Sequence, residues 1–340
     1  MTELRPFTNP TREKADALAA DSRWADLFCF LEGVPEAERV DDAHLAYRYG
    51  EALYHTGRMG LLASHAEAFE IGARRARDVR ALLRALNLRG IAAFELGVPD
   101  EARQAFEALM DLSEAEGDDD MLARAALNLG ALANLQGSPA DALAMYHLAL
   151  PLFQKLGQTR GLSQTHQSLG MSYRDLENWP EAEDAYQEAM RLGTGFGYAP
   201  IVAMAAIGRS EVQVLRGDPH AALSLVEWGL QLSRQLGDPI SEGTALRVRG
   251  TARAATDSSP ELRARGDFQQ ALTLARSTDN VLLEAESLRD LARIAALIPD
   301  AKSARQHYEA AANAFDRLGA RHSALAMEDG IAALEAGPPA

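Results

Sequence analysis

Apolar residues in the middle of the chain recur with the spacing of an α-helix. Ala126, Gly130 and Ala133 lie three or four residues apart within residues 122–136, as expected for one buried face of a helix. Gly137-Ser138-Pro139 follows, with a glycine suited to end this helix, a serine suited to cap the next one and a proline suited to its first turn. The sequence therefore predicts two consecutive helices joined by a tight turn.

The same pattern returns at a constant interval along the chain. The second helix, residues 139–156, carries Ala142, Tyr146 and Ala149 on one face. Glycine within a helix costs about 1 kcal/mol of stability relative to alanine. Because it nevertheless recurs at equivalent positions, we expect the helices to cross closely there. The aromatic ring is expected to fill the gap toward the next unit. The small residue stands at Gly50, Gly90, Gly130, Gly170 and Gly250, with Ser210 at the remaining position.

Self-similarity at this interval indicates a solenoid, in which each unit covers the apolar face of its neighbour. The predicted fold is all-α, an α-solenoid of seven helix pairs over residues 41–319. A helical cap is expected over residues 1–40, and a capping helix with a disordered tail over residues 320–340. The pairs are expected at about 41–80, 81–120, 121–160, 161–200, 201–240, 241–281 and 282–319, with two residues inserted near Asp257–Pro260.

The spacing resembles that of the tetratricopeptide repeat. In that family the first helix carries a large residue followed by Gly or Ala, and the second carries Ala, an aromatic residue and Ala. The repeats here are longer than the usual tetratricopeptide unit and are similar to those of kinesin light chains, bacterial LuxR-type activators and peptide-pheromone receptors. The resemblance implies a right-handed superhelix that binds proteins or peptides in a concave groove. The matching residues are Leu127, Gly130, Ala142, Tyr146 and Ala149.

Charge and composition limit the expected partners. The formal net charge is −15 and the pI is near 5.0, so the chain should repel nucleic acid and anionic lipid surfaces. Neither a signal peptide nor an apolar stretch of membrane-spanning length is visible in the sequence. The one cysteine, Cys29, fits a reducing compartment and is expected to be buried, since its neighbours are apolar. The expected location is cytoplasmic, without contact to membranes or direct contact to nucleic acid.

The resemblance places the first helix of each pair along the concave face and so suggests groove residues. Amides can bond to an extended peptide, arginines can hold carboxylates, and Tyr, Phe and Met offer apolar contact. Arg247, Arg289 and Arg293 are expected to extend the basic line toward the C-terminal end. The bound segment is expected to lie across repeats two to four, although any one arginine could instead pair with a nearby acid. The expected partner-binding residues are Tyr47, Tyr54, Arg84, Asn87, Phe94, Arg124, Asn134, Gln164, Gln167, Met171, Arg174 and Met204.

No catalytic, metal or cofactor site is expected. The eight histidines are scattered and none has the spacing of a zinc motif. The acidic run Asp118–Asp120 lacks the alternation of a calcium loop. Residues 193–197 are glycine-rich, but a predicted helix precedes them and no Lys-Ser/Thr follows.

Three functions remain open at this point. The leading one is a non-catalytic scaffold or sensor in bacterial signalling or regulation, which binds a protein or peptide. The second is a structural module that forms homodimers through its ends, using Trp24 with Phe28 or Leu325 with Ile331. The third and least favoured is an enzyme whose site is assembled from residues far apart in the sequence.

Overall fold

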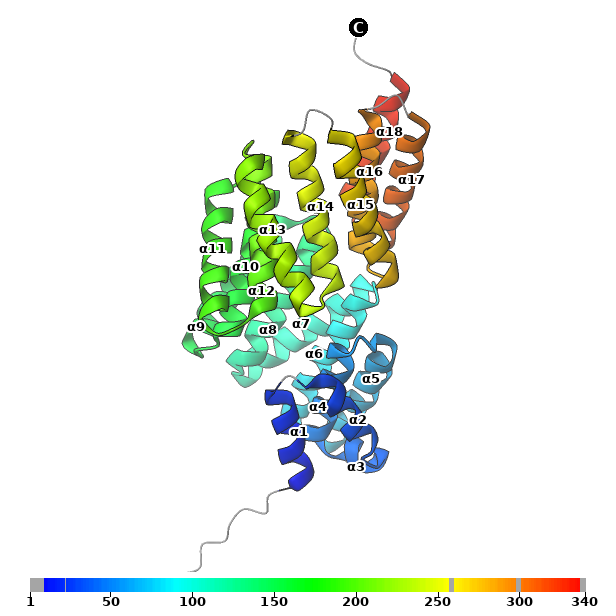
Figure 1. Ribbon diagram of the computed structural model, residues 1–340. Coiled ribbons are helices and arrows are strands. Elements are labelled where there is room, and N and C mark those ends of the chain that lie inside the picture. Colours follow the sequence, from blue (N-terminus) through cyan, green and yellow to red (C-terminus); the bar gives the residue numbers. More distant parts are fainter. Residues whose placement is uncertain (1–8, 22, 257–259, 298–300, 337–340) are drawn as a thin grey trace, which may run out of the picture. The chain divides into compact units, whose positions relative to one another are not determined.

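The chain is all α-helical in the residues that the structure, a computed structural model, describes: 9–21, 23–256, 260–297 and 301–336 (Figure 1). Those ranges contain no strand, which confirms the expected fold class. The chain forms two compact units, unit 1 (Met1–Leu129) and unit 2 (Gly130–Ala340). The insertion expected near Asp257 and the tail expected after residue 336 lie outside the described residues.

Unit 1 begins with three short helices and continues as antiparallel pairs. The first helix of each pair is called the A helix and the second the B helix. α4 and α6 are A helices, α5 and α7 are B helices, and α8 begins the next pair. The helices are α1 (Pro10–Ala20), α2 (Trp24–Glu32), α3 (Glu36–Asp41), α4 (Ala43–His55), α5 (Met59–Ala76), α6 (Val79–Glu95), α7 (Pro99–Glu116) and α8 (Asp119–Leu135).

Unit 2 starts within α8 and continues the same alternation, with even numbers marking A helices up to α16. α18 follows the last pair as a single helix. The helices are α9 (Pro139–Lys155), α10 (Thr159–Asp175), α11 (Trp179–Gly195), α12 (Ala199–Leu215), α13 (Pro219–Leu236), α14 (Pro239–Thr256), α15 (Pro260–Ser277), α16 (Val281–Ala296), α17 (Ala301–Arg317) and α18 (Arg321–Ala336).

The A helices form a continuous layer within each unit. α4 packs on α6 in unit 1, and α10, α12, α14 and α16 pack in that order in unit 2. The B helices α5, α11, α13 and α15 each contact the A helices on either side, and within each unit the described B helices make at most marginal contact with one another. The A helices are thus the more closely spaced layer, which is the inner layer of a curved stack.

Aromatic rings explain the glycines that recur from repeat to repeat. A Cβ atom at Gly130 would lie 2.3 Å from the ring of Tyr146 in the same helix pair. Tyr186 lies against Gly170 of its own pair and also against Gly208 of the next A helix. The expected close crossing is confirmed, but the ring rests first on its own A helix rather than only filling the gap toward the next unit.

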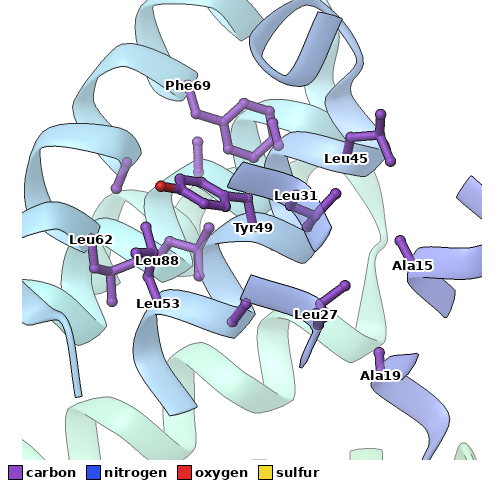
Figure 2. Close-up of a cluster of buried hydrophobic side chains, with 14 of the residues drawn as sticks. Ala15, Ala19, Leu27, Leu31, Leu45, Tyr49, Leu53, Leu62, Phe69 and Leu88 are labelled. Carbon is purple, nitrogen blue, oxygen red and sulfur yellow. The ribbon is translucent and has the colours of Figure 1, made fainter. Parts of the chain in front are cut away.

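The core of unit 1 joins the cap helices to the first repeats (Figure 2). Leu27 and Leu31 of α2 are fully buried and belong to one cluster with Tyr49 of α4, Phe69 of α5 and Leu88 of α6. Leu27 and Leu31 are four residues apart, so one face of α2 supplies both. The cap is therefore part of the same hydrophobic core as the repeats that follow it.

The residues expected to drive self-association at the N-terminal end pack inside unit 1. Trp24 stacks on His55 with 4.0 Å between ring centroids, and Phe28 stacks on Tyr49 at 6.0 Å. The expectation of a buried Cys29 is wrong, because this thiol is exposed. Residue 29 points away from the face of α2 that carries the buried leucines, and apolar neighbours in sequence could not show this.

In unit 2 the last helix contacts the first part of the unit. Leu135, at the end of α8, packs against a cluster formed by α16, α17 and α18. Next to it, a Cβ atom at Gly137 would lie 3.6 Å from the Cβ atom of His322 in α18. This contact joins repeats that are not neighbours, whereas the repeat pattern alone predicted contacts between neighbours. A curved stack can bring its two ends together once enough repeats have been added.

Candidate functional site

All of the residues expected to bind a partner lie on A helices. All but Asn87 are partly exposed, while Asn87 is buried with 3% of its surface accessible. They fall into two groups, one in each unit. Unit 1 holds Tyr47, Tyr54, Arg84, Asn87, Phe94 and Arg124, and unit 2 holds Asn134, Gln164, Gln167, Met171, Arg174 and Met204.

Three of these residues gather in unit 1 from consecutive A helices. The guanidinium carbon of Arg84 on α6 lies 4.9 Å from the ring centre of Tyr47 on α4, a cation–π contact. Burial and the charge of Glu51 raise the pKa of Tyr47 to about 12, while the charges of Arg124 and Arg84 act in the opposite direction. The phenol therefore remains protonated and lies within the field of two guanidinium groups.

The ion pair of Arg124 on α8 lies within its own helix. Its Nε atom donates to Asp120 at 3.1 Å, one turn earlier, and its side chain is 40% exposed. A partly exposed pair within one helix contributes about 0.3–0.5 kcal/mol. Arg124 can therefore turn toward a ligand at little cost.

The two asparagines of the predicted set are engaged in packing. Asn87 accepts a hydrogen bond from Asn128 at 3.3 Å, which links α6 to α8. Asn134 donates to the hydroxyl of Tyr146 at 3.0 Å and accepts from Ser172 at 2.9 Å. Both amides join neighbouring helices, so their hydrogen bonds support the A-helix layer.

The predicted residues of α10 and α12 form a mixed polar and apolar surface. Gln167 donates to the sulfur of Met171, one turn later, at 3.3 Å. Gln164 on α10 and Met204 on α12 are both partly exposed. This part of unit 2 offers amide hydrogen-bonding groups and flexible thioethers without a net charge.

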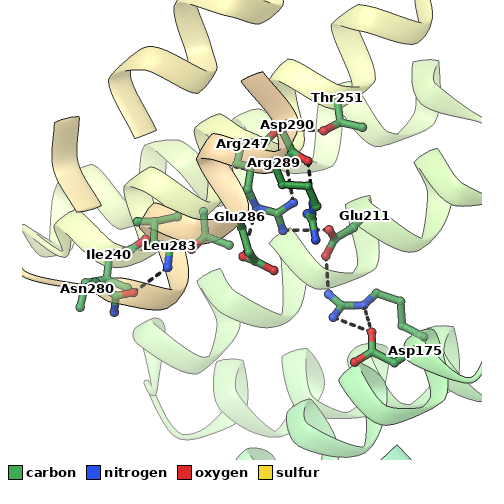
Figure 3. A network of polar contacts seen from close by, with 12 residues as sticks. Asp175, Glu211, Ile240, Arg247, Thr251, Asn280, Leu283, Glu286, Arg289 and Asp290 are labelled. Carbon is green, nitrogen blue, oxygen red and sulfur yellow. Dashed lines mark hydrogen bonds and ion pairs between the residues drawn. The ribbon is translucent and has the colours of Figure 1, made fainter. Parts of the chain in front are cut away.

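Arg174, the remaining predicted residue of α10, belongs to a ladder of ion pairs across four A helices of unit 2 (Figure 3). Arg174 of α10 bonds to Glu211 of α12, which also accepts from Arg247 of α14 at 2.8 Å. Arg247 in turn contacts two carboxylates of α16, Glu286 at 3.3 Å and Asp290 at 3.1 Å. The ladder joins the A helices of successive repeats in a single network.

The ladder contradicts the expectation of a free basic line for Arg247 and Arg289, while the side chain of Arg293 is 63% exposed. Arg247 is only 4% exposed and is neutralised by three carboxylates. Burial alone would raise the pKa of Glu211, but Arg174 and Arg247 outweigh it and hold this pKa below its usual range. Asp290 is held low in the same way by Arg289 and Arg247, so its pKa also lies below the usual range.

The sequence analysis did not predict the ladder, because the arginines and carboxylates that pair lie about one repeat apart in the sequence. Arg174, Glu211, Arg247 and Glu286 follow one another on successive A helices with alternating charge. Such alternation on A helices was visible in the sequence. It could have predicted mutual neutralisation in place of ligand binding.

The described residues hold no metal cluster and no membrane-spanning helix, and a hollow among them involves none of the predicted residues. No cluster of His, Cys, Asp or Glu there could hold a metal ion, and none of the helices described has the length and apolar character needed to cross a membrane. A shallow hollow beside Trp228 is lined by residues of α13, a B helix. It involves none of the residues expected to bind a partner.

Comparison with known proteins identifies the repeats. The sequence profile named "Tetratricopeptide repeat" matches residues 81–155 and 161–235. The helix pairs within these two ranges are tetratricopeptide repeats, and the other pairs of the chain share their arrangement. No curated protein sequence matches the chain, whereas several solved structures match it in fold.

Three similar structures cover nearly the whole chain. A Rap protein complexed with competence and sporulation factor matches with a TM-score of 0.66 and 10% identity over 96% of both chains. NprR in complex with its cognate peptide NprX matches at 0.65 and 13% identity, over 98% of this chain and 100% of its own. Aspartyl phosphate phosphatase F from Bacillus subtilis matches at 0.59 and 11% identity, over 98% and 96%. At such low identity, the likeness shows a shared fold and nothing further.

Proposed function

We propose that this tetratricopeptide repeat protein is a non-catalytic sensor or scaffold that binds a peptide or protein segment on its A-helix faces. The observation that carries the proposal is the gathering of Tyr47, Arg84 and Arg124 from three consecutive A helices of unit 1. A surface of this kind offers a ring face and cationic donors along the line that an extended chain would follow. The surface of Gln164, Gln167, Met171 and Met204 in unit 2 offers amide and thioether contacts.

The similar structures support this use of the fold. The Rap protein carries a bound factor and NprR carries its cognate peptide, so this kind of array can bind a short chain. We extend this to the present protein as a role in bacterial signalling or regulation in the cytoplasm. We assign it no catalytic step, although one similar structure is named a phosphatase.

Site-specific photo-crosslinking tests where a partner binds. A photoreactive phenylalanine analogue is placed at Gln167 on the A helix α10 or, as a matched control, at Gln187 on the exposed side of the B helix α11. In unit 1 the corresponding pair is Phe94 and Gln104. The proposal predicts crosslinks to a peptide or protein segment, in lysate of the source cells, from the A-helix positions only. Equal or stronger labelling from the B-helix positions would refute it.

Arg174 is unsuitable for charge reversal in this test. Its side chain is 17% exposed and bonds both Glu211 and Asp175, so a glutamate there would disrupt the ladder as well as any ligand contact. Homodimer formation remains the alternative function. Light scattering across a range of protein concentrations measures it, and the proposal predicts the mass of a monomer.

A further inference from the structure

Arg84 differs from the other partly buried arginines among the described residues. Each of the others has a carboxylate oxygen within 4.0 Å. Arg84 has none, and its recorded partner is the ring of Tyr47. The remaining described arginines without a carboxylate are exposed to solvent, where water satisfies their charge.

An unpaired guanidinium that is partly removed from water is unfavourable. Burial removes part of the favourable hydration free energy of the guanidinium. Only a charged or hydrogen-bonding partner can replace that energy. The face of Tyr47 attracts the cation but accepts none of its directed N–H bonds. The donors at the edge of the Arg84 guanidinium therefore remain available on this face of unit 1.

The two acids whose charges act on Tyr47 already have partners. Glu51, which acts on Tyr47, accepts from Arg48 at 2.7 Å, and Asp120 accepts from Arg124 at 3.1 Å. Arg84 is therefore the surplus positive charge on this surface, in a chain whose net charge is −15. In unit 2 the arginines of the A-helix ladder are neutralised internally, so unit 2 has no equivalent feature in that ladder.

We propose that Arg84 binds a carboxylate of the peptide or protein segment, with Tyr47 holding the guanidinium and Arg124 adding a second positive charge. A guanidinium offers paired N–H donors that match the two oxygens of a carboxylate. This inference rests on the proposed function and adds to it that the bound segment is acidic at the position that meets α6. The carboxylate belongs either to an Asp or Glu side chain or to a chain terminus.

The probe is a random heptapeptide library selected on the full chain. Selections are run on the wild-type chain, on Arg84→Gln and on Arg80→Gln, which changes an exposed arginine one turn earlier in the same helix. The wild type and Arg80→Gln should enrich Asp or Glu at one position, or a free terminus, and Arg84→Gln should not. Circular dichroism checks that each variant is folded.

Recovered peptides are then synthesised in matched forms. Replacing the acidic side chain by its amide, or the terminal acid by an amide, distinguishes the two sources of the carboxylate. The change that removes the relevant carboxylate should weaken binding to the wild type by about tenfold or more and should have little further effect on Arg84→Gln. This peptide change does not depend on how well the variant folds.

The outcomes separate this inference from the function on which it rests. Peptides that crosslink to the A-helix positions without any acidic preference, or that bind Arg84→Gln as tightly as the wild type, would overturn the role of Arg84 alone. Recovery of no binding peptide would count against both the role of Arg84 and the proposed function.

Discussion

At the scale of single residues, the glycines inside the A helices are required by the rings beside them. A Cβ atom at Gly90 would lie 2.3 Å from the ring of Phe106, closer than any packed carbon can approach. Gly72, inside the B helix α5 of the same unit, has no atom within 4 Å of the corresponding position. The two glycines therefore differ in packing while both lie within helices.

Replacing these two glycines by alanine should have opposite effects. Gly90→Ala should lower the free energy of unfolding by about 1–3 kcal/mol, since it overpacks the crossing with Phe106. Gly72→Ala should raise it by up to about 1 kcal/mol through helix propensity. Urea unfolding monitored by circular dichroism measures both. A Gly90→Ala variant at least as stable as the wild type would contradict the steric explanation.

The turn between α10 and α11 contains a residue in an unfavourable backbone conformation. Glu177 has φ of 59°, whereas the equivalent residues Gly97, Gly137 and Gly217 have φ between 71° and 83°. A left-handed conformation costs a residue with a side chain about 1–2 kcal/mol. Glycine avoids this cost.

Glu177→Gly should therefore stabilise the protein by about 1 kcal/mol. The control is Glu177→Ala, which removes the same charge but keeps the Cβ atom, and it should bring no comparable gain. The measurement is the shift of the thermal midpoint of each variant. Equal midpoints for the two variants would show that the backbone conformation is not the cause.

At the scale of elements, Arg247 of α14 connects helices on both sides. It is almost completely buried and binds carboxylates from α12 and α16. Removing one member of a buried ionic network is costly because the remaining charges lose their compensation. The sequence around Arg247 suggested a ligand contact. It does not show that α12 and α16 place carboxylates directly opposite this side chain.

Arg247→Met should destabilise unit 2 by about 3–5 kcal/mol at neutral pH. Arg265→Met, at an exposed arginine of α15, is the control and should change stability by less than about 0.5 kcal/mol. Urea midpoints of the two variants provide the comparison. A loss for Arg247→Met no larger than that of the control would show that the ladder adds nothing to stability.

The same ladder predicts that the folded chain loses stability as the pH falls. The pKa values of Glu211 and Asp290 are lowered in the folded chain, so their contribution is complete above the unfolded value of about 4. It should be lost progressively as the pH falls below that value and through the folded pKa values. Arg247→Met removes a cause of the lowering, so its penalty relative to the wild type should shrink between pH 7 and pH 3.

At the scale of the whole molecule, the repeat pattern of the sequence does not predict the contact between α18 and the start of unit 2. It joins Gly137 and His322, residues from repeats far apart in the sequence. A Cβ separation of 3.6 Å falls within the range found in disulfides, about 3.5–4.5 Å. The contact can therefore be tested by crosslinking.

Gly137→Cys combined with His322→Cys, in a Cys29→Ser background, should form a disulfide on mild oxidation. The control is Gly157→Cys with His322→Cys, because Gly157 also has a positive φ but has no atom within 4 Å of its Cβ position. Intact mass and mobility on a non-reducing gel report the bond. Its absence in the first variant, or equal formation in both, would contradict the contact between α18 and the turn after α8.

The sequence by itself determined the helix pairs, their order and their small-on-aromatic crossings. These follow from spacings within a single repeat, such as Gly130 with Tyr146, where local chain geometry dictates which side chains meet. Only the tertiary structure decided which polar groups remain free. Arg84 and Arg247 both lie on A helices, yet one lies on a ring without an acid and the other is enclosed by three carboxylates. The difference arises because pairing depends on what the neighbouring helices place opposite each side chain.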